Sequence, residues 1–381
     1  MLVIFWAAVA VIVYIYVIFP LLILLRGALF PRPYQQADIT PSVSLVIAAY
    51  NEERDIGEKL QNILALDYPR ELLDVVIASD GSSDSTNEIV ARVAENHNHI
   101  RLLALPRQGK AGALNDGVAA SKGEILVFSD GNSKYLPDAI RKIVRPFADP
   151  SVGGVAGNQR YLPPTKEVSN AGETSYWSFD RLLKVFESRG GNVISATGAI
   201  YAIRRSLFQG VPEGVTDDFT TSTKVIAQGY RLVFAEDAIA LEPVAKSVGL
   251  EYGRKVRVMT RGLNAVVVMR ELLNPFKHGF YALQLLSHKV LRRLVFVPMI
   301  VLLIVTPFLW NDGWFYRLAL IAQLGFYGLA ILGALFERAG KKLPKVAAIP
   351  FFVTMVYTAA MIATWNVITG RQVKSWKPQR S

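Results

Sequence analysis

The feature that most constrains this fold is an alternation of short apolar segments and amphipathic segments that begins near residue 41. Apolar runs typical of buried strands occur at 43–50, 73–80, 100–106 and 124–130. The segments between them have the spacing of amphipathic helices. Strands that alternate with helices predict right-handed crossovers, and therefore an α/β fold with a Rossmann-like, mostly parallel sheet.

Polar side chains follow three of these predicted strands at the point where each strand ends. They are Tyr50, Glu52, Asp80, Asp130 and Asn132. Ligands of open parallel sheets bind outside the carboxyl ends of the strands, so these side chains are candidates for a binding site.

Two common nucleotide-binding motifs are missing from the sequence. No G-x-G-x-x-G follows the first predicted strand, and Gly109-Lys110 lacks the rest of a P-loop. Carboxylate and amide oxygens suit Mg²⁺ or Mn²⁺, which bridge substrate phosphates. Asp130 and Asn132 are therefore predicted to hold such an ion, and an ordinary turn at 130–132 is the alternative.

Four apolar stretches lie outside this α/β region. The segment 2–25 carries no charge and is long enough to cross a hydrocarbon core of roughly 30 Å. It lacks a basic start and a small-residue cleavage site, which favours an uncleaved anchor over a signal peptide. Further spans are predicted at 294–310, 314–336 and 346–367, and a re-entrant last segment broken at Pro350 is the alternative.

Basic residues beside the predicted spans indicate the orientation. Arg26 and Arg32 follow the first span and place the α/β region in the cytoplasm of a multi-pass protein of the cell membrane. The loop 337–345 and the tail are both basic, and the positive-inside rule cannot place both in the cytoplasm. The predicted divisions are an anchor at 1–28, an α/β domain at 40–250, interfacial helices at 251–292, C-terminal spans at 293–370 and a basic tail at 371–381.

The net charge of +11 suits anionic lipid headgroups or a phosphorylated substrate. Nucleic-acid binding is disfavoured, because much of the positive charge flanks the spans and no basic-aromatic platform is visible.

The absence of cysteine excludes disulfides and thiolate metal sites. Segment 251–292 mixes aromatic, aliphatic and basic residues as interfacial helices do, with core packing as the alternative. No protein partner can be identified from the sequence.

Six short motifs follow one another along the chain. They are VSLVIAAYNEE, ASDGSSDST, RQGKAGALNDGV, FSDGNS, ATGAIYAIRRSLF and TDDF. Their order resembles that of the family-2 glycosyltransferases, in particular the chitin-oligosaccharide, hyaluronan and poly-N-acetylglucosamine synthases. The resemblance covers roughly residues 42–265 and implies a GT-A fold. It also implies inverting, metal-dependent transfer of a hexosyl or N-acetylhexosaminyl group.

On the donor side, the resemblance implies that Tyr50, Glu52 and Asp80 hold the nucleoside of a UDP-sugar. Lys110 then approaches the diphosphate, and Asp130 binds the metal on it.

Arg254 and Arg257 lie where membrane-bound members carry Q-x-x-R-W, and the resemblance places them near the donor diphosphate. Contact of this basic cluster with lipid headgroups is the alternative. Val258 stands where those members carry Trp, which leaves processivity open.

On the acceptor side, the resemblance implies that Asp218 is the catalytic base, with Asp217 beside it and with Thr197 and Gly198 at the acceptor. A carboxylate base removes the proton of the attacking hydroxyl, and repulsion between adjacent acids raises the pKa of at least one of them.

The function implied is the building of a cell-envelope or extracellular polysaccharide at the membrane. Addition of a single sugar to a lipid or polyprenyl-phosphate acceptor is the second hypothesis. A non-catalytic subunit that retains the fold is disfavoured, because Asp80, Asp130 and Asp218 are all present.

Overall fold

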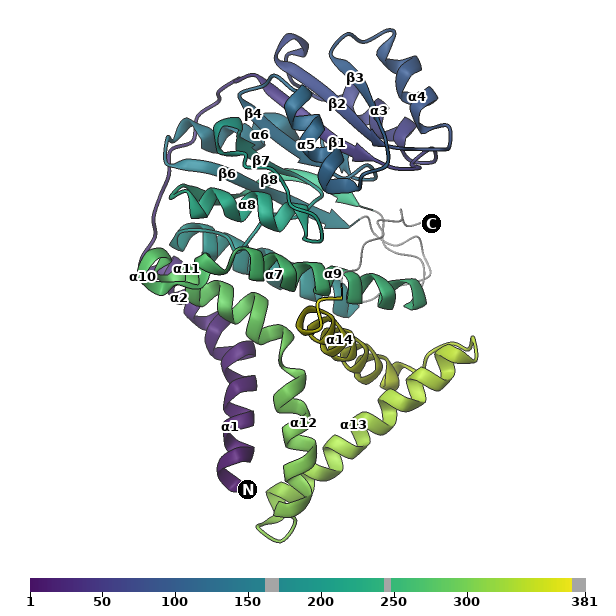
Figure 1. Ribbon diagram of the computed structural model, residues 1–381. Helices are drawn as coiled ribbons and strands as arrows, with labels where there is room; N and C mark the ends of the chain where they lie inside the picture. The colour runs from purple at the N-terminus through teal and green to yellow at the C-terminus, as the bar shows by residue number, and fades with distance from the viewer. Residues whose placement is uncertain (162–170, 243–247, 372–381) are drawn as a thin grey trace. The chain divides into compact units, whose positions relative to one another are not determined.

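The computed structural model describes residues 1–161, 171–242 and 248–371 (Figure 1). The expected tail at 371–381 lies outside these ranges from residue 372 onward. The chain divides into two compact units, and each is described by itself. The sheet unit contains Leu22–Lys246 and Val268–Ala282, and the helical unit contains Met1–Leu21, Ser247–Val267 and Leu283–Val373.

The sheet unit is built on one sheet of eight strands. The strands are β1 (Val43–Ala49), β2 (Leu73–Asp80), β3 (Ile100–Leu105), β4 (Ile125–Ser129), β5 (Lys134–Tyr135), β6 (Val152–Tyr161), β7 (Tyr201–Arg204) and β8 (Arg231–Glu242). Their order across the sheet is β3-β2-β1-β4-β7-β6-β8-β5. The four strands at the β3 end are parallel, whereas β7 runs antiparallel to both of its neighbours. The predicted α/β fold is confirmed, and the sheet is mixed.

Helices cover both faces of this sheet (Figure 1). They are α3 (Ile56–Leu64), α4 (Thr86–Ala94), α5 (Lys110–Ala120), α6 (Ala139–Val144), α7 (Ala171–Gly190) and α8 (Asp217–Ala227). Strand β1 is buried along its whole length, as its continuous apolar sequence predicts. Leu45 and Ile47 pack in one core cluster with Leu60 of α3. Helix α5 lies on β1 and β2, and a Cβ added at Gly117 would come within 2.7 Å of Val46 Cγ1.

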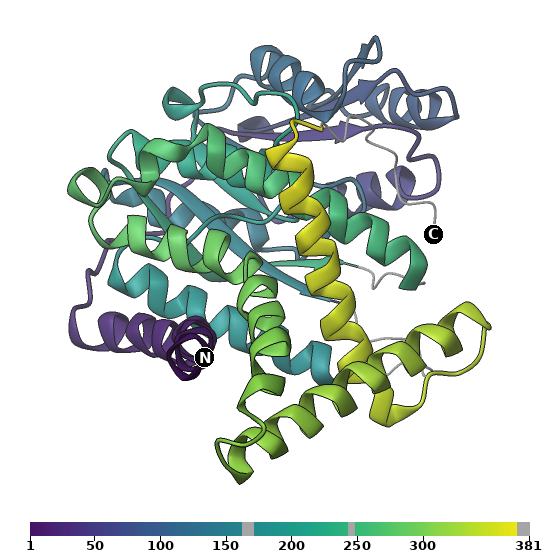
Figure 2. The same cartoon turned by 60° about the horizontal axis from the view of Figure 1, so that its bottom comes forward.

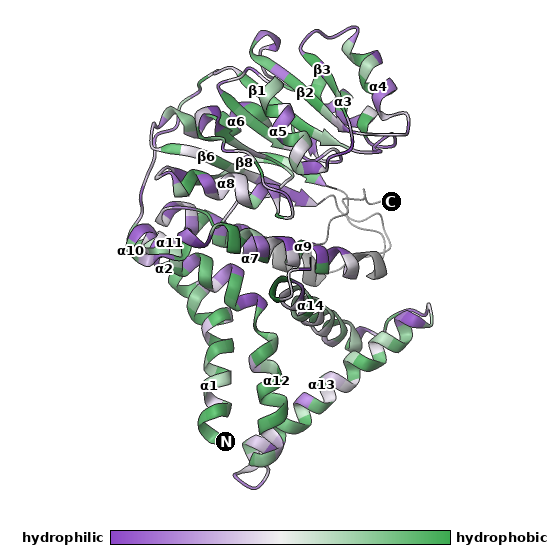
Figure 3. Cartoon of the chain, in the orientation of Figure 1, coloured by the Kyte–Doolittle hydropathy of each residue, from purple (hydrophilic) through white to green (hydrophobic). Residues whose placement is uncertain are grey.

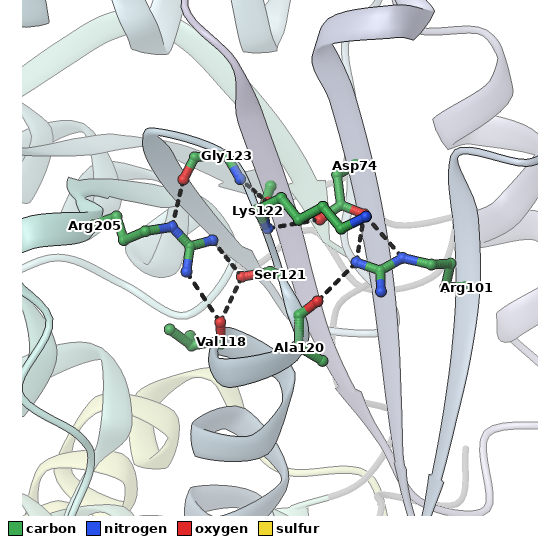
Figure 4. A network of polar contacts seen from close by, with 9 residues as sticks. Asp74, Arg101, Val118, Ala120, Ser121, Lys122, Gly123 and Arg205 are labelled. Carbon is green, nitrogen blue, oxygen red and sulfur yellow. Dashed lines mark hydrogen bonds and ion pairs between the residues drawn. The ribbon is translucent and has the colours of Figure 1, made fainter.

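A polar network fixes the C-terminal end of α5 at the edge of the sheet where β2 begins (Figure 4). Arg101 forms an ion pair with Asp74 and donates to the Ala120 carbonyl at 2.9 Å. Arg205 donates to the Gly123 carbonyl and to Ser121 Oγ at 2.5 and 2.6 Å. We call these five residues, Asp74, Arg101, Ser121, Gly123 and Arg205, the anchor network.

The remaining helices are strongly apolar in several stretches (Figure 3). They are α1 (Leu2–Val13), α2 (Phe19–Leu29), α9 (Val248–Val268), α10 (Pro275–His278), α11 (Phe280–Leu285), α12 (Phe296–Val305), α13 (Trp314–Arg338) and α14 (Lys345–Ile368). Within the described residues, three helical segments are long and apolar enough to cross a membrane, namely Leu2–Leu29, Trp314–Arg338 and Lys345–Ile368. A bent pair, Phe280–Leu291 with Phe296–Leu309, is a fourth candidate if it acts as one span.

The structure adds two details to the predicted spans. The segment expected at 294–310 belongs to the bent pair, whose two parts meet at 57°. Helix α14 continues through Pro350, so the alternative of a segment broken there is not observed. Helices α13 and α14 pack against each other within the helical unit (Figure 2). A Cβ added at Gly333 would lie 2.7 Å from Phe351 Cβ, which shows how close the two helices are.

Candidate active site

Asp130 lies directly after β4 at the carboxyl end of the parallel strands. Its backbone N–H donates to the Gly198 carbonyl at 3.0 Å, and Ser129 Oγ donates to the Asp130 carbonyl at 3.1 Å. The carboxylate packs on Gly198, because a Cβ added there would lie 2.6 Å from Asp130 Oδ2. The Asp130 side chain is nevertheless 33% exposed. The fold therefore holds this carboxylate in place and leaves part of it accessible.

Lys110, the first residue of α5, joins two of the predicted acids. Its Nζ lies 2.7 Å from Asp130 Oδ1 and 3.0 Å from Asp217 Oδ2. Burial by itself would lower the pKa of Lys110, but the charges of Asp130 and Asp217 raise that pKa well above its ordinary value. The ammonium is therefore charged, and it connects the Asp130 carboxylate to the acid pair on α8.

Asp217 and Asp218 begin α8, where the helix dipole favours negative charge. Asp218 Oδ1 accepts a hydrogen bond from the Phe219 N–H at 2.7 Å. Burial, with the neighbouring charge of Asp217, raises the pKa of Asp218 to about 6. The raised pKa expected for one member of this pair is therefore found at Asp218, although burial has the larger effect and repulsion the smaller.

Asp80 is completely buried at the end of β2. Its carboxylate accepts hydrogen bonds from the Gln108 and Gly109 N–H groups at 2.7 and 2.9 Å and pairs with the Arg107 guanidinium. That guanidinium lies 3.4 Å above the centroid of the Tyr50 ring. Asp80 therefore holds the loop that leads into Lys110, a role absent from the predictions. Arg107 was also missed, because nothing in its sequence context separates it from a solvated basic residue.

Glu52 lies over the turn that carries Asp130. Its carboxylate carbon would be 3.8 Å from a Cβ added at Gly131, and its backbone N–H donates to Thr86 Oγ1 at 2.8 Å. Burial and the charges of Asp55 and Asp130 raise the pKa of Glu52 to about 7. Of the predicted donor-side residues, Glu52 and Lys110 are thus close to Asp130, whereas Tyr50 and Asp80 meet at Arg107.

The residues that surround Asp130 fit a divalent cation that is coordinated partly by the protein and partly by a bound substrate. Within 1–161, 171–242 and 248–371, no three His, Asp or Glu side chains form a group that could enclose a metal. Mg²⁺ and related ions are usually held by one or two carboxylates, substrate phosphates and water, and the accessible Asp130 carboxylate meets that requirement. Asn132 is exposed on the same turn.

The other predicted site residues lie in two different places. Thr197 and Gly198 precede β7, and Gly198 packs on the Asp130 carboxylate. Arg254 and Arg257 lie on α9, whose residues 248–267 belong to the helical unit. Burial and the charges of Arg261 and Arg254 lower the pKa of Arg257, as expected within a strongly basic segment. Their place near a donor diphosphate stays a prediction.

The chain is similar to several known proteins. The family model described as "Glycosyltransferase like family 2" matches residues 41–283. The poly-beta-1,6-N-acetyl-D-glucosamine synthase of Staphylococcus aureus strain COL is 25% identical over 283 residues, which cover 73% of this chain and 68% of that protein. The Staphylococcus epidermidis synthase of the same name is 24% identical over 281 residues, which cover 72% and 66%.

A solved structure has the same fold. It is a mannosyltransferase from Pyrobaculum calidifontis in complex with GDP-Man and Mn²⁺. The two chains align with a TM-score of 0.72 and 24% identity, over 97% of this chain and 100% of the other.

Proposed function

Since the chain belongs to the family described as "Glycosyltransferase like family 2", we propose that it transfers a sugar from a UDP-sugar to a glycan acceptor with inversion. The product is a cell-envelope or extracellular polysaccharide. The observation that carries this proposal is the Lys110 ammonium, which lies between Asp130 and Asp217 and beside Asp218. The names of the staphylococcal relatives favour N-acetylhexosamine as the transferred sugar.

Asp218 is the proposed general base for the acceptor hydroxyl. With a pKa raised to about 6, its carboxylate is mostly ionised at neutral pH and is more basic than an ordinary aspartate. Asp217 is not the proposed base, because its carboxylate is paired with the Lys110 ammonium. The ion pair keeps Asp217 in place beside Asp218. Asp218 takes the proton of the hydroxyl as the new glycosidic bond forms, and the nucleoside diphosphate leaves from the opposite face of the sugar.

Asp130 is the proposed ligand for Mg²⁺ or Mn²⁺, with Asn132 beside it. When bound, the cation supplies electrostatic stabilisation of the leaving diphosphate. Lys110 adds a second positive charge at the same edge of the sheet, already fixed by Asp130 and Asp217. The Mn²⁺ in the Pyrobaculum structure, which has the same fold, is consistent with this choice of metal. Tyr50, Glu52 and Asp80 are the proposed nucleoside side of the pocket, and Arg254 and Arg257 are proposed to approach the diphosphate.

We propose that the protein is a multi-pass protein of the cell membrane, with the catalytic domain at 40–250 in the cytoplasm. The three long apolar helices support insertion. The anchor at 1–28, the interfacial helices at 251–292 and the spans at 293–370 then tether the catalytic domain to the membrane.

One observation favours a second function, the addition of a single sugar to a lipid or polyprenyl-phosphate acceptor. Val258 stands where polymerising relatives carry a Trp that the resemblance associates with stacking on the acceptor sugar. Its side chain is 45% exposed on α9 and has no ring with which to stack.

Both functions are tested by one assay on purified membranes that contain the full chain. A panel of radiolabelled UDP-sugars is supplied with and without Mn²⁺, and the products are sized. A ladder of lengths from one donor, lost with the metal chelated, supports polysaccharide synthesis, and a single glycolipid product supports the second function. Membranes with the surface variant Asp138→Asn serve as the matched control. A preparation that turns over no UDP-sugar contradicts both.

A further inference from the structure

One lysine of the sheet unit lies inside the apolar core. Lys59 is on α3, only 1% of it is exposed, and its helix neighbours Ile56, Leu60 and Ile63 are core residues. Moving an ammonium out of water has an effective cost of several kcal/mol in proteins, so a buried lysine requires strong partners. An apolar side chain would fill this position at lower cost, and the contacts of the Lys59 ammonium therefore need an explanation.

The ammonium contacts both ends of the turn that carries Asp130. Lys59 Nζ donates to Ser129 Oγ at 2.7 Å, and it donates to the Ser133 carbonyl at 2.5 Å. Ser129 ends β4, and Ser133 directly precedes β5. One side chain of α3 thus fixes the start and the end of the 129–133 turn, while Ser129 Oγ donates onward to the Asp130 carbonyl.

The same contacts continue into the edge of the sheet. Ser133 Oγ donates to Glu242 Oε1 at 2.9 Å, and Gln159 Nε2 donates to Glu242 Oε2 at 2.5 Å. The Lys59 ammonium also lies 4.3 Å from the centroid of the Tyr135 ring. Burial lowers the pKa of Lys59 to about 7, against the opposing effect of the charges of Asp130 and Glu242. The turn is therefore held from the buried side by a connected polar network.

We propose that Lys59 is a positioning residue for the metal site: by holding both ends of the 129–133 turn, it fixes the direction in which the Asp130 carboxylate meets the cation. The effect on metal binding rests on the proposed function, because it requires that Asp130 is the metal ligand. Residues that orient a ligand from behind typically change metal affinity or activity by about 10–100-fold when they are replaced.

The test replaces the ammonium and keeps most of the side-chain volume. In the full-length protein, Lys59→Met removes both hydrogen bonds to the turn. Lys224→Met is the matched control, because the Lys224 ammonium also donates to backbone carbonyls, at Gly210 and Gln209, in another loop. Two quantities are measured for each variant: hydrogen exchange of the peptide 129–135 without metal or donor, and binding of Mn²⁺ in the presence of UDP.

In Lys59→Met we expect faster exchange in 129–135 and Mn²⁺ binding weaker by about tenfold or more, with neither change in Lys224→Met. Unchanged exchange together with unchanged Mn²⁺ binding overturns the proposal. If the wild type itself binds no Mn²⁺ with UDP, the metal part of the proposed function is overturned, and exchange alone then decides whether Lys59 holds the turn. If Lys59→Met does not fold, Ser129→Ala, which removes one of the two acceptors, must show smaller shifts in the same directions.

Discussion

The two ends of α5 hold polar clusters of opposite character. At its C-terminal end, the anchor network joins Asp74 to Arg101 and satisfies Arg205 with carbonyl and hydroxyl oxygens of 118–123. At its N-terminal end, Lys110 faces Asp130 and Asp217, with Asp218 beside them. Both clusters lie at an edge of the same sheet, yet only the second has more acidic than basic groups.

This difference indicates that the C-terminal end of α5 stabilises the fold, whereas the N-terminal end is suited to act on a ligand. In the anchor network, each charged group meets fixed partners within the chain, so its loss is expected to reduce stability. At the other end, burial and mutual repulsion make the ionised carboxylates less favourable than they are in water, as the raised pKa values of Asp218 and Glu52 indicate. Perturbed pKa values are typical of sites that act on a ligand.

The largest expected effect comes from Asp218→Asn. An amide cannot take up the proton of the attacking hydroxyl, so kcat should fall by about 10³-fold. Because burial disfavours the charged form of Asp218, the neutral amide should leave the thermal unfolding temperature at pH 7 unchanged or higher. Initial rates and thermal unfolding measure both. A variant with near-wild-type kcat would assign the base role to another residue.

Gly198→Ala should have the next largest effect. The added methyl would meet Asp130 Oδ2 at 2.6 Å and must displace the carboxylate. A displacement of about 1 Å can reduce turnover by about 100-fold, and apparent metal affinity should fall with it. Metal titrations of the initial rate test this. Gly57→Ala on α3, where the atom nearest to the added carbon is Ile89 Cγ2 at 3.9 Å and φ is ordinary, is the matched control.

The pH profile should show the raised pKa of Asp218 directly. The base acts only when ionised, so kcat/KM should fall about tenfold for each pH unit below a pKa of about 6. The stability contribution has the opposite direction. The folded-state pKa lies above the unfolded value, so this group stabilises the fold at low pH, and that contribution is lost as the pH rises through about 6. A flat rate profile between pH 5 and 7, both taken as about one unit either side of that pKa, would contradict the assignment.

Asn132→Asp should act in the favourable direction and more weakly. It adds a second formal charge to the exposed turn beside Asp130, and cation affinity rises with the number of charged ligands. We expect Mn²⁺ to bind several-fold more tightly, measured by titration with UDP present. Unchanged affinity would mean that residue 132 does not face the cation.

Arg205→Met tests the other end of α5 and should leave the activity of the folded protein nearly unchanged. It removes the donors to the Gly123 and Val118 carbonyls and to Ser121 Oγ. A buried acceptor left unsatisfied costs about 1–3 kcal/mol of unfolding free energy. Denaturation and specific activity are measured together. A loss of kcat larger than the loss of folded protein would show that the two ends of α5 are not separable.

The parallel half of the sheet was predictable because its strands are buried on both faces and therefore read as continuous apolar runs. The predicted strands at 43–50, 73–80 and 124–130 match β1, β2 and β4 to within about two residues, the usual uncertainty of element ends. The reversed direction of β7 was not predictable, because strand direction leaves no local pattern. The bend between Leu291 and Phe296 was missed for a similar reason, since hydropathy records apolar length and not direction.

Motif order singled out the individual acids of the candidate site, but it did not predict the residues with which they pair. The pairing of Lys110 with Asp217 joins segments more than a hundred positions apart in the sequence. Gly198 was expected at the acceptor, and the structure shows why a glycine is needed there for another reason, the close approach of Asp130. Lys59 resembles any helix lysine in the sequence, and only its burial distinguishes it.

The anchored helix α5 has a consequence for the entropy of ligand binding. At 1.5 Å per residue, its 11 residues carry Lys110 about 16 Å from the anchor network. The backbone freedom of Lys110 is therefore lost when the domain folds and not when the donor arrives. A donor that meets an ordered ammonium keeps more of its interaction energy as affinity.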